Sequence, residues 1–316
     1  MTIDMHTHLM VKEFHHESFV APFWSPGDHT SLKHEMGSEN AGKEESRAYW
    51  GPLDPDGSGH IKRMNDAGID KAVLLHIDLG LLFGEPEMTI QQQHEHVSEI
   101  VKRHPDRFIW FCGVDPRRED ASPLVERCVT RLGARGIKLY PTTGFLPADK
   151  EVYPLYERAS AWKIPVYFHM GPENPPYKNE GNAHASVLLR VLVDFPDLTV
   201  IVAHLGFEWW RDLIALGKVR ENVMCDFCAW QPVAKYNYEQ FRYILRRFLD
   251  EFGGHRVMFG SDAPLTEDEL SSKEWVEIVK GLPRQPEASY PFTEEEIVAL
   301  LETNARRLLA SIPDKI

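Results

Sequence analysis

Histidine and aspartate side chains stand at the ends of several short β-rich segments of this 316-residue sequence. His6 and His8 end the first segment, His169 the fifth, His204 the sixth and Asp262 the eighth. Residues two apart on a strand point to the same face, so the rings of His6 and His8 can share one ion. Imidazole suits zinc and other divalent ions, and a carboxylate from another strand can complete a site that leaves one position open for water. These residue types therefore predict a catalytic metal site.

The histidines and the aspartate meet only if their segments are parallel strands whose carboxyl ends share one edge. Eight segments rich in apolar and β-branched residues alternate with helix-like stretches along the chain. Near-continuous apolar strands separated by amphipathic helices are typical of a parallel sheet covered by helices. We therefore predict the α/β class and a (β/α)8 TIM barrel, with an open doubly wound sheet as the alternative. The predicted strands span residues 2–8, 71–77, 107–114, 134–140, 164–171, 199–206, 222–230 and 256–264.

The chain is longer than the roughly 250 residues of a typical barrel of this kind. The additional residues lie in 9–60, a stretch with several Gly and Pro, many charges and weak periodicity. We predict a single barrel domain over 1–316, with 9–60 inserted after the first strand as a loop or lid over the barrel mouth. Arg47 in this insertion is a candidate substrate-binding residue. Deletion of 12–55 is expected to abolish turnover and leave the metal bound, and equal turnover without the segment would contradict the lid.

The charge balance bears on the class of partner. The chain has 35 Lys and Arg side chains against 48 Asp and Glu side chains, a formal charge of −13. An acidic protein is not drawn to nucleic-acid phosphates or anionic lipids, so we expect neither partner. No apolar run reaches the roughly 18 residues needed to span a bilayer, and the N-terminal MTIDMHTHLM lacks the features of a secretory signal. We expect a cytoplasmic protein.

The remaining cysteines and histidines are assigned structural or surface roles. Four cysteines are too few for a disulfide framework at this length, so we expect reduced, buried thiols, including the Cys225 and Cys228 pair. His94 and His96 lie in a helix-like run where residues two apart diverge, and we predict that they are surface histidines. For His76, at the end of the second strand, we expect a structural role and not a functional one. Solvated side chains are predicted for the histidines of the insertion, His15, His16, His29 and His34.

Four motifs together resemble one enzyme family. IDMHTH, VYFHMG, IVAHLG and FGSDAP are similar to motifs of the amidohydrolase superfamily, in the branch that contains aminocarboxymuconate-semialdehyde decarboxylase, resorcylate decarboxylases and pyrone-dicarboxylate lactonase. The resemblance runs from residue 2 to about 309 and excludes the insertion. It implies that a catalytic divalent ion, zinc or alternatively manganese, is held by His6, His8, His169 and Asp262. It also implies that His204 acts as a general base or acid beside the ion.

Lys138 bears on the number of metal ions. The segment KLYP, residues 138–141, is similar to the fourth strand of dihydroorotase, where a carbamylated lysine bridges two ions. Related decarboxylase-branch sequences carry similar segments with a single ion, and an unmodified Lys138 would bind a substrate carboxylate or phosphate as a point charge. We favour one ion per chain, with two if Lys138 is carbamylated. Tyr140, which follows on the same strand end, is a further candidate substrate-binding residue.

The motifs do not decide between two reactions that the same metal site can catalyse. Hydrolysis of a lactone, ester or amide needs a proton acceptor, which His204 and Asp262 can supply. Non-oxidative decarboxylation of an aromatic or muconate-type acid is the alternative, and a non-catalytic barrel is a second alternative. The GSDAP segment favours hydrolysis, because the compared decarboxylases carry an aromatic residue and Pro after the Asp. We expect a small organic acid as substrate, and the branch is compatible with a homodimer.

Overall fold

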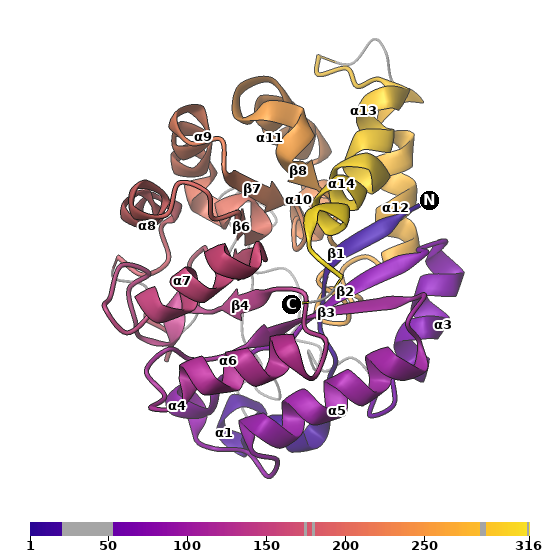
Figure 1. The fold of residues 1–316 in the computed structure, drawn as a ribbon. Helices are drawn as coiled ribbons and strands as arrows, with labels where there is room; N and C mark the ends of the chain where they lie inside the picture. Colours follow the sequence, from indigo (N-terminus) through magenta and orange to yellow (C-terminus); the bar gives the residue numbers. More distant parts are fainter. Residues whose placement is uncertain (21–52, 174–175, 179–180, 285–288, 315) are drawn as a thin grey trace.

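Eight parallel strands form a single sheet in which each strand pairs with the next one along the chain. The computed structural model describes residues 1–20, 53–173, 176–178, 181–284, 289–314 and 316, and Figure 1 shows these strands at the centre with helices around them. The unbroken order β1 to β8 confirms the predicted barrel and excludes the doubly wound sheet, in which the strand order reverses. The strands are β1 (Ile3–Thr7), β2 (Lys71–Leu75), β3 (Phe108–Gly113), β4 (Ile137–Leu139), β5 (Val166–Phe168), β6 (Val200–Val202), β7 (Val223–Asp226) and β8 (Val257–Met258).

The first and last strands close the barrel through backbone hydrogen bonds. Met5 N donates to Phe259 O at 2.9 Å, and further along Asp262 N donates to His6 O at 2.8 Å. His8 N donates to Ala263 O at 2.8 Å. The closure therefore binds the segment after β8 directly against the histidine pair of β1.

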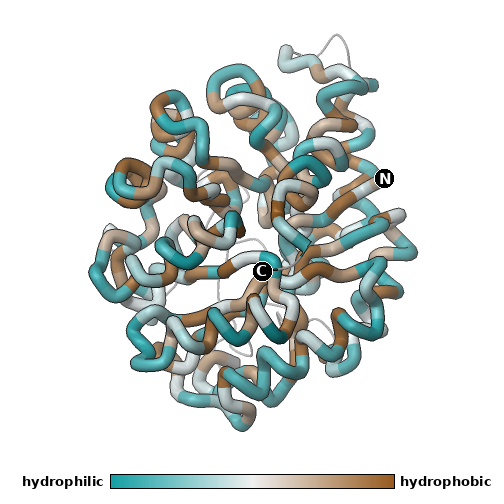
Figure 2. The backbone as a smooth tube through the Cα atoms, in the orientation of Figure 1, coloured by the Kyte–Doolittle hydropathy of each residue, from teal (hydrophilic) through white to brown (hydrophobic). Residues whose placement is uncertain are grey.

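Helices cover the outside of the barrel and bury its strands. All five residues of β1 are buried, as are all residues of β4, β5 and β6. In Figure 2 hydrophobic residues lie along the strands, while the surrounding helices mix hydrophobic and hydrophilic residues. The helices are α1 (Glu17–Val20), α3 (Ser58–Ala67), α4 (Gly80–Phe83), α5 (Ile90–Arg103), α6 (Ala121–Thr130), α7 (Tyr153–Trp162), α8 (Leu189–Asp194), α9 (Trp210–Val219), α10 (Gln231–Tyr236), α11 (Tyr238–Arg247), α12 (Ser272–Gly281), α13 (Glu294–Val298) and α14 (Asn304–Ser311).

Capping boxes define where several helices begin. Thr293 caps α13 by accepting a hydrogen bond from Glu296 N, while the Glu296 side chain accepts one from Thr293 N. This reciprocal pair satisfies two backbone donors that a helix start leaves free. None of the helices in the described part of the chain is both long and apolar enough to cross a membrane.

The insertion after β1 is described only at its two ends. Residues 9–20 form a short 3-10 turn, η1 (Lys12–Phe14), and α1, and the barrel resumes with α3 at Ser58. The last three residues of the predicted insertion therefore belong to a barrel helix. The central part of the predicted lid, with Arg47, His29 and His34, lies outside the described residues.

Two histidine expectations are wrong. His94 is 1% exposed, because it lies on the face of α5 that also buries Ile90, Gln93 and Val97. Its Nε2 is 2.8 Å from Gly113 O, so the ring bonds α5 to β3. His15, expected in solvent, is half-buried at the wall of a pocket. In both cases tertiary packing buries an imidazole that its polarity alone assigns to the surface.

A buried ion pair holds together the loops after β2 and β3. Arg118 donates to both carboxylate oxygens of Asp78, at 2.6 and 2.8 Å, and also to Glu85 at 2.8 Å. Asp78 also accepts from Asp115 N at 2.8 Å. Burial acts to raise the pKa of Asp78, but the hydrogen bonds and charge of Arg118 outweigh it and lower that pKa below its usual value.

Replacing Arg118 by methionine is expected to reduce the free energy of unfolding by about 3 kcal/mol, because it leaves the buried Asp78 carboxylate uncompensated. Since the folded pKa of Asp78 is depressed, the wild-type stabilisation is present above the unfolded value of about 3.9. It is lost as pH falls through the folded pKa. Urea unfolding at several pH values measures both effects. The control is Arg306→Met, whose exposed pair with Glu302 is expected to contribute about 0.5 kcal/mol or less.

Candidate metal centre

Three predicted ligands meet where β1 and the segment after β8 pair. His8 Nε2 lies 3.1 Å from His6 Nε2 and 3.0 Å from Asp262 Oδ1. The distance from His6 Nε2 to Asp262 Oδ1 is 3.5 Å. Asp262 has a positive φ of 60°, a conformation that is costly for a non-glycine residue. The fold therefore accepts local strain to place this carboxylate against the two rings.

Hydrogen bonding fixes the tautomer of His8. Its Nδ1 lies 2.8 Å from the carbonyl oxygen of Leu75, which can only accept a hydrogen bond. Nδ1 must therefore carry the proton. In the neutral ring this leaves a lone pair on Nε2, the atom that faces His6 and Asp262.

His6 is fixed in the same way by a carboxylate. Its Nδ1 lies 3.0 Å from Asp226 Oδ2, and both side chains are completely buried or nearly so. Burial lowers the pKa of His6 well below its usual value, and the positive charge of Lys138 acts in the same direction. The neutral ring donates from Nδ1 to Asp226 and leaves a lone pair on Nε2.

Three electron pairs thus converge with no proton between them, from His6 Nε2, His8 Nε2 and Asp262 Oδ1. A buried cluster of acceptors is unfavourable unless a cation lies among them. Among the described residues, Asp262 Oδ1 is an acceptor atom of the predicted site that is buried without a hydrogen bond. Imidazole nitrogen and carboxylate oxygen are ligands of zinc and manganese. The residues present therefore fit a divalent ion.

Asp226 is the important residue that the sequence analysis missed. Besides His6 Nδ1, it accepts hydrogen bonds from the Tyr167 hydroxyl, from His204 N at 3.1 Å and from Cys228 N at 2.9 Å. A carboxylate that orients a metal-ligating histidine is a recurrent feature of metal sites. Its position at the carboxyl end of β7 was the available signal, because the other site residues occupy the same end of their strands.

Replacing Asp226 by asparagine is expected to lower metal affinity by about 10- to 100-fold, because the amide cannot hold the His6 proton on Nδ1 as a carboxylate does. Metal titration of the chelator-treated protein measures the change, and circular dichroism checks the fold. The matched control is Asp212→Asn, which alters an aspartate–histidine pair with His184 outside the site and is expected to leave affinity unchanged. Equal affinities in the two variants would contradict the orienting role.

Gly260 shows how closely the strands approach behind the histidines. A Cβ atom at this position would lie 2.9 Å from the Cβ atoms of both His6 and Cys228. Such a distance is far below normal van der Waals contact, so only glycine fits here. The glycine allows the end of β8 to lie directly against β1 and β7.

His169 lies beside the three converging ligands but not among them. Its Nδ1 is 3.1 Å from His204 Nε2, and its Nε2 is 3.0 Å from Glu173 Oε1. Tyr140 stacks on the ring with 4.0 Å between centroids and donates to Glu173 at 2.5 Å. The tight three-residue group contains His6, His8 and Asp262. Metal ligation by His169 stays a prediction, and Glu173 is a second neighbour that the sequence analysis missed.

His204 lies between the predicted ligands and a thiol. Its Nδ1 is 3.0 Å from Cys228 Sγ, and Trp230 Nε1 donates to its carbonyl oxygen at 2.6 Å. The backbone from His204 to Phe207 has positive φ throughout, which turns the chain sharply after β6. Burial lowers the pKa of His204 well below its usual value, with the neighbouring His6 and His169 acting in the same direction. The imidazole is therefore neutral.

The candidate substrate-binding residues have different surroundings. Lys138 is 1% exposed, with Nζ 4.9 Å from the centroid of the Tyr167 ring. Burial lowers its pKa to about 8 against the opposing charge of Asp226. The hydroxyl of Tyr140 is engaged by Glu173, and Arg47 lies outside the described residues.

Comparison with solved structures shows the same fold in several enzymes. A probable 2-pyrone-4,6-dicarboxylic acid hydrolase of Acinetobacter baumannii is 15% identical, with a TM-score of 0.64 over 98% of this chain and 99% of the other. The manganese-containing 5-carboxyvanillate decarboxylase of Novosphingobium aromaticivorans is 18% identical, with a TM-score of 0.63 over 98% and 96%. The 2,6-dihydroxybenzoate decarboxylase of Rhizobium is 17% identical, with a TM-score of 0.65 over 98% of both chains.

Sequence comparisons give the family. A search of curated proteins found no match. The family model described as Amidohydrolase matches residues 3–310, which include all eight strands and all the described residues of the metal centre. The chain therefore belongs to the amidohydrolase family of enzymes.

Proposed function

We propose that this protein is a metal-dependent hydrolase that cleaves a C–O or C–N bond in a lactone, ester or amide of a small organic acid. The observation that carries the proposal is that three unprotonated ligand atoms converge. They are His6 Nε2, His8 Nε2 and Asp262 Oδ1. Such an arrangement supports one divalent ion, because the buried lone pairs have no proton to satisfy them.

His6, His8 and Asp262 would hold this ion, with His169 as the fourth predicted ligand. Zinc is the favoured metal and manganese the alternative, the latter being the ion in the solved Novosphingobium decarboxylase of the same fold. When bound, the ion polarises a substrate oxygen and lowers the pKa of water.

The chain's own residues supply the proton transfer and the binding of charge. His204 is neutral and lies 3.1 Å from His169, so it is placed to accept a proton beside the metal centre. Lys138 is a buried cation whose Nζ makes no hydrogen bond within the described residues, so it can bind a carboxylate of the substrate. Asp226 holds the proton of His6 on Nδ1 and keeps its Nε2 available to the ion.

A single ion is favoured over two. A second group of potential ligands consists of His6, His204, Asp226 and Cys228. Asp226 already accepts four hydrogen bonds, and its contact with His6 occupies Nδ1 of that ring. These contacts account for the second group without an ion. Two ions per chain would instead indicate that Lys138 is carbamylated.

Non-oxidative decarboxylation is the second candidate function. The solved structures with this fold include decarboxylases of carboxyvanillate and dihydroxybenzoate as well as a pyrone-dicarboxylic acid hydrolase. A buried cation such as Lys138 would bind the carboxylate of either kind of substrate. Hydrolysis and decarboxylation differ in their products, because only the second releases carbon dioxide.

The test begins with metal content per chain, measured by mass spectrometry on protein purified without chelator. The metal-replete protein is then offered lactones, esters and amides of small organic acids, and separately hydroxybenzoates, with products identified by mass spectrometry. Water addition without carbon dioxide release supports the hydrolase. Carbon dioxide release favours the decarboxylase, and no turnover of either class in metal-replete protein favours a non-catalytic barrel.

The organic acid is the proposed small-molecule partner, and a homodimer in the cytoplasm is the proposed state of the protein. Light scattering coupled to size-exclusion chromatography measures the mass in solution, and a monomer at micromolar concentration would contradict the dimer.

A further inference from the structure

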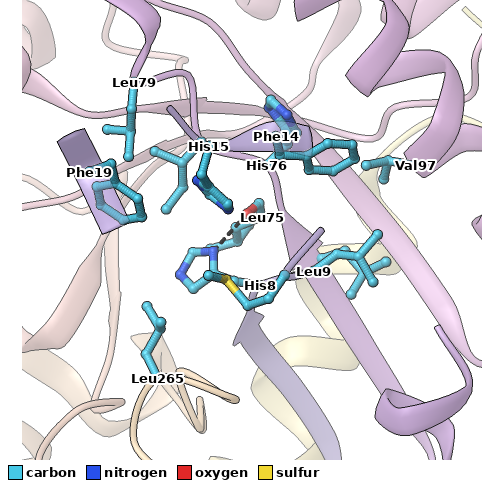
Figure 3. Close-up of a pocket in the computed structure, with 13 residues that line it drawn as sticks. His8, Leu9, Phe14, His15, Phe19, Leu75, His76, Leu79, Val97 and Leu265 are labelled. Atoms are coloured by element: carbon cyan, nitrogen blue, oxygen red, sulfur yellow. Dashed lines mark hydrogen bonds between the residues drawn. The ribbon is translucent and has the colours of Figure 1, made fainter. Parts of the chain in front are cut away.

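A pocket opens beside the metal centre on the side of His8. Its walls come from the ends of β1 and β2, from η1 and α1, from α5 and from the segment after β8. Figure 3 shows His8 near the middle of the lining residues, with Phe19 and Leu79 on the left and Phe14 and Val97 on the right. The space between the side chains amounts to about 480 Å³, part of it open to solvent. The enclosed part of this space measures only about 30 Å³, which is room for a short substituent and not for a whole organic molecule.

The pocket is apolar apart from three imidazoles. Its described lining includes no Asp, Glu, Lys or Arg, and its polar side chains are His8, His15 and His76. His15 is half-buried in the wall, and burial lowers the pKa of His76 to about 4, which favours its uncharged ring. His76 Nε2 is also paired with Gln93 Oε1 at 2.8 Å. The described wall thus offers no charge to a ligand.

Two arginines in the loop after β3 are already paired. Arg118 is bound by Asp78 and Glu85, and Arg117 donates to Asp115 at 2.6 and 2.9 Å. The buried Lys138 belongs to β4 and lies against Tyr167, and it is not part of the pocket wall. A carboxylate placed in the pocket would therefore lose its hydration without gaining a counter-ion from the described wall residues.

We propose that this pocket binds an apolar alkyl or aryl substituent of the substrate, while the bond that reacts lies at His6, His8 and Asp262. The substrate class is then an organic acid derivative with a hydrocarbon arm. This class differs from the dicarboxylic acid named for the Acinetobacter structure. The inference rests on the proposed metal-dependent function, because His8 is both a wall of the pocket and a predicted ligand.

The test uses hydroxamates, whose head group binds divalent metals, as probes on the metal-loaded protein. Acetohydroxamate, butyrohydroxamate and hexanohydroxamate differ only in the hydrocarbon arm, and succinate monohydroxamate carries a carboxylate at the end of a short arm. Affinity measured by calorimetry is expected to rise about three- to fourfold per added methylene, the factor expected for burying a methylene group. Succinate monohydroxamate is expected to bind no better than acetohydroxamate.

Two variants fill the pocket, and one is a matched control. Leu79→Trp places an indole at the pocket wall, and Leu265→Trp does so at a half-buried position that tolerates a larger side chain more readily. Leu81→Trp makes the same change on the exposed side of α4, where Leu81 is 45% exposed. The dependence of affinity on chain length is expected to disappear in the first two variants and to persist in the control.

The outcomes distinguish failure of the pocket proposal from failure of the proposed function. If acetohydroxamate binds but affinity is independent of chain length, or if the dependence survives in both pocket variants, the apolar pocket is rejected while the metal centre stands. Tighter binding of succinate monohydroxamate than of hexanohydroxamate would also reject it. Protein that retains no metal would overturn both proposals. A chain-length dependence without hydrolysis of any substrate would support the pocket and reject the hydrolase.

Discussion

Replacing His8 by alanine is expected to remove the metal ion and abolish turnover. His8 Nε2 is the ligand atom closest to both other members of the group, at 3.1 Å from His6 and 3.0 Å from Asp262. Its lone pair is directed by the hydrogen bond from Nδ1 to Leu75 O, a geometry that alanine cannot reproduce. Loss of an orienting neighbour alone costs about 10- to 100-fold in metal affinity, so loss of the ligand itself is expected to cost at least about 100-fold.

The measurement is metal content per chain after dialysis, together with turnover at saturating metal. His255→Ala is the control. His255 is exposed and comes before β8 in the sequence, whereas Asp262 comes after it. Wild-type metal content is expected in the control. Full metal occupancy in His8→Ala would contradict the assignment of this centre.

Replacing His204 by glutamine is expected to lower kcat by about 10²- to 10⁴-fold, the range for loss of a general base or acid. Metal content is expected to stay at the wild-type level, because His204 is outside the group formed by His6, His8 and Asp262. Glutamine keeps a polar side chain near Cys228 and His169, so the variant tests proton transfer with little change in volume. Steady-state kinetics separates the effect on kcat from that on KM.

The matched control is His184→Gln, because His184 stacks on Trp209 and contacts Asp212 away from the metal centre. Its kcat is expected to equal that of the wild type. Loss of metal from His204→Gln would assign His204 as a ligand and favour two ions. Unchanged kcat would contradict its part in proton transfer.

Much of the fold follows from local patterns in the sequence. Apolar β-branched segments alternate with amphipathic helices, and this alternation specifies parallel strands because only such strands are buried on both faces. The structure confirms each of the eight strands within the predicted segments. Thr293 and Glu296 mark the start of α13 because capping depends on residues only three apart.

Part of the site also follows from the sequence. The two-residue spacing of His6 and His8 predicts that both rings lie on one face of the first strand segment, and Asp262 comes from the predicted eighth strand segment. The structure brings these three together. The ligation assigned to His169 and the catalytic role assigned to His204 remain predictions, and residue type alone could not place their nitrogen atoms.

Only the tertiary structure decided which ring nitrogen of each histidine carries the proton, and therefore which nitrogen can bind a metal. Asp226 lies 220 residues from His6 along the chain, and Leu75 lies 67 residues from His8. These acceptors reach the rings because the barrel closes and β1 and β2 pair, and no local spacing in the sequence encodes such contacts. The sequence determined the strands, the residue types at their ends and the family. Burial and long-range hydrogen bonding determined the tautomers, the exposure of His94 and the apolar pocket beside His8.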